Sequence, residues 1–130
     1  MYYFEKDYIM RLIHGISRAL ARIFLNREVE EGGRFVTRMD KAARQADDAL
    51  KRMIDEGRIN AAENRLFDLI GSSAWEQHRL AALILSFYDY ANSKDDAFLA
   101  KSGFSREEII DGLEEAMKAV GLEIPEYLRI

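Results

Sequence analysis

The 130-residue sequence contains no cysteine, a single proline and two histidines. Without cysteine it has no disulfide, no thiolate metal site and no thiol nucleophile, and such a composition fits a reducing compartment. Its longest apolar runs are short, such as 80–85, whereas a membrane-spanning helix needs about 20 apolar residues. Acidic residues precede the first apolar run, and a secretory signal would need a basic start and an unbroken apolar stretch. We therefore expect a cytoplasmic protein.

The chain is 48% apolar and 32% charged, and its formal net charge is −4. A chain of this length usually forms one domain, and it buries enough surface to be stable without a disulfide or a metal. The high apolar fraction and the modest net charge are unlike those of a disordered chain. We predict a single helical domain over residues 1–130.

Apolar residues recur at helical spacing along most of the chain, and no segment shows the alternation of a strand. The pattern predicts six helices, over 4–26, 34–56, 60–70, 74–92, 94–101 and 105–120. The segment 74–92 is apolar nearly all round, which is typical of a helix at the centre of a bundle. We therefore predict an all-α fold, a compact bundle of five to six helices followed by an irregular tail.

Glycine and hydroxyl residues mark where these helices begin and end. Acidic residues and two glycines over 28–33 predict a loop, and the residues that we expect to end helices are Gly57, Gly71, Gly103 and Gly121. Ser105 and Glu108 match a capping box; the other candidate N-caps are Asn60, Ser73 and Ser93. Gly15 falls inside the first helix, where we expect it to permit the close approach of another helix.

The second and third predicted helices are joined by only two to four residues, which requires an antiparallel hairpin. The spacing of small and large residues over 46–69 resembles that of a tetratricopeptide repeat, carried by Ala46, Ala49, Met53, Gly57, Ile59, Ala62, Leu66 and Leu69. The repeat's terminal proline is missing, and one hairpin cannot form a solenoid. The resemblance implies a tetratricopeptide-like hairpin at the centre of the bundle. An ordinary helical hairpin with alanines at its contact is the alternative.

The N-terminal stretch 2–13 reads Tyr-Tyr-Phe-Glu-Lys-Asp-Tyr-Ile-Met-Arg-Leu-Ile. Together with the rest of the chain, it resembles a family of short, uncharacterised helical proteins of Gram-positive bacteria. The resemblance implies a small bacterial cytoplasmic protein and assigns no activity and no site residues.

The first predicted helix carries an excess of positive charge. Residues 1–27 contain five basic and two acidic residues, so that their net charge is +3 and that of residues 28–130 is −7. Arg11, Arg18 and Arg22 lie within about 40° of one another around a helix. Such a face is either a solvated or internally paired surface, or a surface that binds a protein partner or a second copy. An anionic ligand and a peripheral membrane contact are less favoured, and nucleic acid is disfavoured because the pI is only 5.3.

Acidic residues gather at the other end of the chain, where 105–130 holds seven acids and three bases. Glu107 and Glu108 lie in the first turn of the predicted helix, where acidic side chains interact favourably with the helix dipole, and they need no functional explanation. Di-metal carboxylate bundles use a Glu-x-x-His element, and the sequence contains none. We therefore expect no metal site and no cofactor. Whether the arginine face of the first helix pairs with this acidic helix is left open by the sequence.

No phosphate-binding glycine loop, nucleophile elbow or dinucleotide fingerprint occurs. His14 lies beside the arginine face, and His78, which lies near Trp75, is expected to be structural. The aromatic residues Trp75, Tyr88 and Tyr90 either belong to the core or line a pocket between helices. The sequence thus predicts a protein-interaction or adaptor module without catalytic activity, which binds through Arg11, Arg18 and Arg22. The alternative is a small-molecule binder or enzyme with an aromatic pocket.

Overall fold

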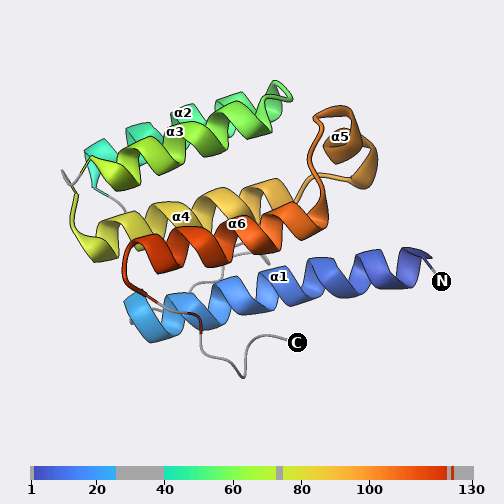
Figure 1. Ribbon diagram of the computed structural model, residues 1–130, viewed down its shortest axis with the longest axis horizontal. Helices are drawn as coiled ribbons and strands as arrows, with labels where there is room; N and C mark the ends of the chain where they lie inside the picture. The colour runs from blue at the N-terminus through green and yellow to red at the C-terminus, as the bar shows by residue number, and fades with distance from the viewer. Residues whose placement is uncertain (1, 26–39, 73–74, 123, 125–130) are drawn as a thin grey trace.

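The computed structural model describes residues 2–25, 40–72, 75–122 and 124, and in that part of the chain all regular structure is helical (Figure 1). The helices are α1 (Tyr2–Leu25), α2 (Lys41–Asp55), α3 (Ile59–Gly71), α4 (Gln77–Asn92), α5 (Asp96–Lys101) and α6 (Arg106–Ala119). The predicted all-α bundle of five to six helices is therefore confirmed. None of these helices is long and apolar enough to cross a membrane.

Helix α4 lies at the centre of the bundle, as its apolar circumference predicts (Figure 1). Every residue from 80 to 88 is buried. Helices α1, α2, α3 and α6 all pack against α4, and α1 also contacts α6. The antiparallel hairpin of α2 and α3 forms one side of the bundle, and α1 forms the other. The prediction that this hairpin is central is wrong, because α4 is the helix that is buried nearly all round.

The core is built from the apolar faces that the sequence pattern marks. Helix α1 contributes Ile13, Ile16 and Leu20, which are at most 6% exposed. After α6 the chain continues into the core through Leu122 and Ile124, both of which are buried. Residues 125–130, the rest of the predicted tail, lie outside the described part of the chain.

Several helix ends follow the predicted signals. Gly57, Gly103 and Gly121 have φ values of 80°, 69° and 80°, a conformation that glycine adopts without the steric cost of a Cβ atom. Ser105 and Glu108 form the predicted capping box, in which the Ser105 hydroxyl accepts from Glu108 N and the Glu108 carboxylate accepts from Ser105 N.

The starts of α2, α3, α4 and α5 differ from the predicted signals. Helix α2 does not run continuously from residue 34, because Asp40 is extended and its side chain accepts a hydrogen bond from Ala43 N, so that the helix begins at Lys41. The N-cap positions of α3, α4 and α5 are Arg58, Glu76 and Asp95. The N-caps predicted for these three helices were Asn60, Ser73 and Ser93. Residues 26–39 and 73–74, which include the predicted loop and Ser73, lie outside the described residues.

Candidate functional site

A groove of about 430 Å³ lies between α1 and α2, and α4 forms its floor. It exists because α1 and α2 both pack on α4, one on each side of the face that carries Ser86, Asp89, Tyr90 and Ser93. Its volume lies within the range of about 300–1,000 Å³ that is typical of ligand sites. The structure thus offers a preformed surface at the junction of three helices.

The α1 wall of the groove carries two of the three arginines that the sequence singles out. Arg11 and Arg18 both line it, seven residues apart and therefore on one side of the helix. Gly15 lies between them and is exposed, and a Cβ atom placed on it would meet nothing within 4 Å. Gly15 therefore leaves space in the groove, and the expectation that it allows another helix to approach closely is wrong.

The opposite wall carries Lys51 of α2. Its Nζ lies 2.9 Å from Asp47 Oδ2 one turn away, and 5.3 Å from the centre of the Tyr90 ring. Asp47 in turn accepts a hydrogen bond of 2.7 Å from the buried Ser86 hydroxyl of α4. This chain of contacts fixes a cation at the rim and ties α2 to the groove floor.

Across the floor, His14 Nδ1 of α1 lies 3.0 Å from Asp89 Oδ1 of α4. Both side chains are partly exposed to the groove, at 29% for His14 and 17% for Asp89. The pair joins residues that are 75 positions apart in the sequence. It holds α1 in place along α4 and gives the Asp89 carboxylate a partner within the protein.

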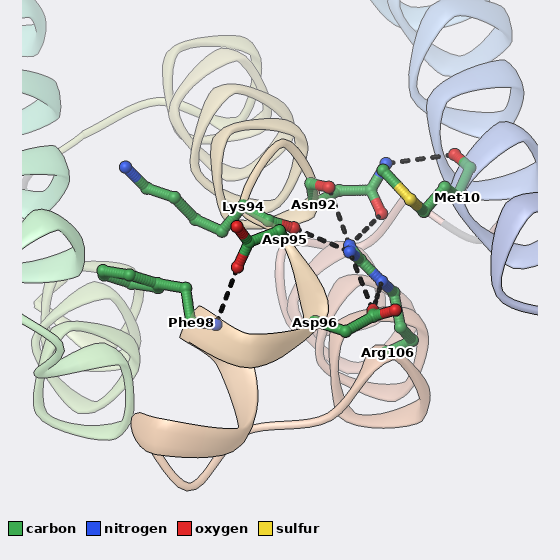
Figure 2. Close-up of polar contacts among 7 residues, drawn as sticks. All are labelled: Met10, Asn92, Lys94, Asp95, Asp96, Phe98 and Arg106. Atoms are coloured by element: carbon green, nitrogen blue, oxygen red, sulfur yellow. Dashed lines mark hydrogen bonds and ion pairs between the residues drawn. The ribbon is translucent and has the colours of Figure 1, made fainter. Parts of the chain in front are cut away.

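One end of the groove is held by a buried polar network that Figure 2 shows. Arg106 of α6 is 5% exposed, and it donates to Asn92 O at 2.7 Å, Asn92 Oδ1 at 3.0 Å and Lys94 O at 2.6 Å. It also contacts Asp96 Oδ1 at 3.2 Å. Asn92 Nδ2 then donates to Met10 O of α1 at 3.0 Å. Met10 and Asn92 both line the groove. Arg106 therefore holds this end of the groove in place through its hydrogen bonds to Asn92, although Arg106 does not itself line the groove.

A second cluster, formed by Asp55, Tyr90 and Lys94, ties the C-terminal ends of α2 and α4 together. Asp55 Oδ1 accepts hydrogen bonds from Tyr90 Oη and from Lys94 Nζ, each over 2.6 Å. These hydrogen bonds, that of Lys94 first, lower the pKa of Asp55, and the same contact with Asp55 raises the pKa of Lys94. The Tyr90 ring is thereby held against the groove.

The electrostatic balance of the groove favours an anionic occupant. Three of its lining residues are cationic (Arg11, Arg18 and Lys51), and one, Asp89, is acidic. Within the described residues, no group of three or more histidine, aspartate or glutamate side chains could hold a metal ion. What this arrangement can do is bind carboxylate or phosphate groups through paired cations.

The remaining predicted site residues lie elsewhere. Arg22 is exposed on α1 beyond the groove. Tyr88 is fully buried and donates to Glu63 Oε2 of α3. Trp75 precedes α4, and its ring lies 5.2 Å from the Arg79 guanidinium. Of the three aromatic residues, Tyr90 alone lines the groove, and the structure does not bring them together around it.

The acidic helix α6 meets α1 on a different side. A smaller hollow between these helices is lined mainly by apolar residues, Leu12, Ile13, Ile16, Ile110, Leu113 and Ile124, with Glu114 at its edge. In the groove that holds Arg11 and Arg18, α1 faces α2 across a floor formed by α4.

Sequence reasoning missed Gly15 as a groove residue, and it missed Lys51 and Asp89 as partners of the arginine face. Gly15 had a local signal, because it lies between Arg11 and Arg18 on the helix. Lys51 and Asp89 had none, because their positions relative to α1 depend on how α2 and α4 pack.

No curated protein and no solved structure matches this chain. A family of unknown function, DUF6483, matches residues 3–121, which cover all six helices apart from the first residue of α1. The resemblance to an uncharacterised helical family is thus confirmed in its general form. The chain belongs to the family of unknown function DUF6483.

Proposed function

We propose that this protein is a small interaction or adaptor module of the bacterial cytoplasm, which binds another protein in the groove between α1 and α2. The observation that carries the proposal is the placement of Arg11 and Arg18 on one wall of the groove and Lys51 on the other. Cations on both walls allow a bound segment to be held from two sides.

The rigidity of the groove supports a role in binding. Its floor belongs to the most buried helix of the bundle, and its walls are fixed by the His14–Asp89 pair and by the contacts of Asp47 with Ser86 and Lys51. A surface that is ordered before binding loses less conformational entropy when a partner docks. In the α2–α3 hairpin, Gly57 has a positive φ and Ala62 is buried, which is compatible with a tetratricopeptide-like arrangement. Helix α2 of this hairpin forms one wall of the groove.

A small-molecule ligand is the second candidate. The volume of about 430 Å³ and the Tyr90 ring at the groove support it. In this alternative Tyr90 provides the aromatic contact, since Trp75 and Tyr88 do not line the groove. A thermal-shift screen with cellular metabolites that gives a hit, abolished by Gly15→Leu, would favour this candidate over a protein partner.

The test of the proposed function is site-specific photo-crosslinking in living cells. A benzophenone amino acid replaces Ser93, which lines the groove and is exposed, and in a matched control it replaces the exposed Asn64 of α3. We expect a discrete crosslinked protein from position 93 and none from position 64. The same crosslink should disappear when Gly15→Leu fills the groove.

Equal crosslinking from both positions, or crosslinking that survives Gly15→Leu, would contradict a role for the groove. A crosslink between two copies of the chain would instead identify the protein as a homodimer that uses this surface.

A further inference from the structure

The arginine spacing along α1 suggests the kind of segment that the groove binds. Arg11 and Arg18 are separated by about 10 Å along the helix axis, and the exposed Arg22 follows about 6 Å further on the same side. A row of cations of this length exceeds the size of a single small anion. It matches carboxylates that are seven residues apart on a helix, or about three residues apart on an extended chain.

We propose that the groove binds an acidic peptide segment of another protein, whose successive carboxylates pair with Arg11 and Arg18 of α1. This inference rests on the proposed function and names the chemistry of the partner. Arginine is suited to the role because its planar guanidinium forms two parallel hydrogen bonds with a carboxylate. Lys51 on the facing wall adds a third cation, and Gly15 leaves room for the segment between the two arginines.

Two acidic side chains lie close to the cations of the groove, Asp89 in its lining and Asp47 beside Lys51. Asp89 lies 3.0 Å from His14 Nδ1, and Asp47 receives the Ser86 hydroxyl and the Lys51 ammonium group. Both carboxylates therefore have other partners inside the bundle. An incoming carboxylate meets a net positive surface, which accelerates association and selects against basic segments.

A membrane surface fits the same cations less well. A basic helix that lies on lipid inserts its apolar face among the acyl chains. In α1 that face is part of the core, since Ile13, Ile16 and Leu20 are at most 6% exposed. The arginine side of α1 alone would meet the headgroups, so that a peptide with its own ordered carboxylates is the better match.

A second copy of the chain is also a poorer match, although α6 carries an exposed acidic row at Glu107, Asp111 and Glu115. Tyr88 points from α4 towards Gly112 of α6, and it lies about 200° around α4 from both Ser86 and Tyr90. Helix α6 is therefore on the side of α4 opposite the groove. If the groove of one copy bound α6 of the next, the copies would associate head to tail and would not close into a symmetric dimer.

The experiment measures binding of fluorescent peptides by anisotropy at low ionic strength. The probe is a helical alanine-based peptide with two glutamates seven residues apart, and the matched peptide carries glutamines in their place. We expect the wild type and Gly15→Ala to bind the glutamate peptide about tenfold more tightly than the glutamine peptide. Added salt should weaken this binding because the rim of the groove is exposed to solvent.

Variants of the protein locate the binding. Arg11→Glu combined with Arg18→Glu should lower the affinity for the glutamate peptide by about tenfold or more, and Gly15→Leu should abolish it without changing any charge. The control combines Arg52→Glu with Arg65→Glu, which makes the same change of charge at exposed positions outside the groove, and should bind as the wild type does. Circular dichroism and thermal unfolding verify that each variant is folded.

Equal affinity for the two peptides, or full binding by the Arg11 and Arg18 variant, would overturn the proposal. Sedimentation of the wild type as a larger species that this variant loses would also overturn it, in favour of a second copy in the groove. If the crosslink from position 93 is obtained but the glutamate peptide does not bind, the interaction module stands and the acidic partner does not.

Discussion

Tyr88 of α4 donates a hydrogen bond of 2.5 Å to Glu63 Oε2 of α3, and Gly112 of α6 lies directly against both side chains. A Cβ atom on Gly112 would approach Tyr88 Oη to 2.6 Å and Tyr88 Cε1 to 2.8 Å. Three helices thus meet at a point where one of them has no side chain. This contact sets how closely α6 approaches the hairpin, on the side of α4 opposite the groove.

Gly112→Ala should destabilise the protein. Although alanine is the better helix former, its methyl group cannot enter without displacing the buried Tyr88 ring, and overpacking of this kind costs about 1–3 kcal/mol. Urea unfolding followed by circular dichroism measures the effect. Gly15→Ala is the control, because its methyl group enters open space and should raise the free energy of unfolding by about 1 kcal/mol. Equal midpoints for the two variants would show that the contact at Gly112 does not limit packing.

Glu63 should make the stability of the protein depend on pH. Burial is the main cause that raises the pKa of Glu63, and the nearby Glu108 and Glu115 carboxylates raise it further, while the Tyr88 hydrogen bond opposes them. Because the pKa is higher in the folded protein, the associated stabilisation is fully present below the unfolded value of about 4.5. It is lost as the pH rises through the folded pKa.

The variant Glu63→Gln should therefore gain stability relative to the wild type as the pH rises above about 4.5. Urea unfolding at a series of pH values gives the difference between the two proteins. Asp40 and Asp55 have lowered pKa values, so that they change the stability with pH in the opposite direction. Their contribution is the same in the wild type and in the variant, and it cancels in the difference between the two proteins. Glu107→Gln at an exposed position is the control. A difference for Glu63→Gln that stays constant across this range would contradict the prediction.

Arg106→Met should be strongly destabilising. The side chain is buried, donates to the carbonyl oxygens of Asn92 and Lys94, and contacts Asp96. Each buried carbonyl oxygen that is left without a donor costs about 1–3 kcal/mol. Chemical unfolding measures the loss. Arg58→Met removes an exposed ion pair with Glu56 and should change stability by less than about 1 kcal/mol. A loss at position 106 as small as that at position 58 would show that the network contributes little.

Ser17→Ala should stabilise the protein. The Ser17 hydroxyl is fully buried in α1 and has no hydrogen-bond partner among the described residues. A buried hydroxyl without a partner costs about 1–3 kcal/mol, and alanine also favours the helix. Thermal unfolding should show a higher midpoint for the variant. An unchanged or lower midpoint would indicate that the hydroxyl does have a partner, such as a bound water.

Local signals in the sequence account for much of the secondary structure. The capping box at Ser105 and Glu108 and the positive-φ turn at Gly57 depend on residues within one turn of each other. The prediction that helix α2 begins at residue 34 was wrong, and the reason is also local. The apolar spacing of Phe35 and Met39 extends the helical pattern across Asp40, although Asp40 is itself a favourable N-cap residue.

The candidate site was predictable only in part. The seven-residue spacing of Arg11 and Arg18 places them on one side of any helix, and the structure has them line one groove. The same reasoning cannot pair His14 with Asp89, or Ser86 with Asp47, because these contacts join residues 75 and 39 positions apart. It also predicted that Tyr88 and Tyr90 line one pocket, although side chains two positions apart in a helix point about 200° apart around its axis.

The sequence by itself determined that this protein is a bundle of helices and where most of those helices end. It also determined that positive charge gathers on the first helix. Helical periodicity sets the angular position of each side chain within its own element, and glycine and capping residues act within a turn. Only the tertiary structure decided that α1 and α2 lie on either side of one face of α4. That arrangement depends on side-chain packing summed over all the helices, and it is what turns an arginine stripe into the wall of a groove.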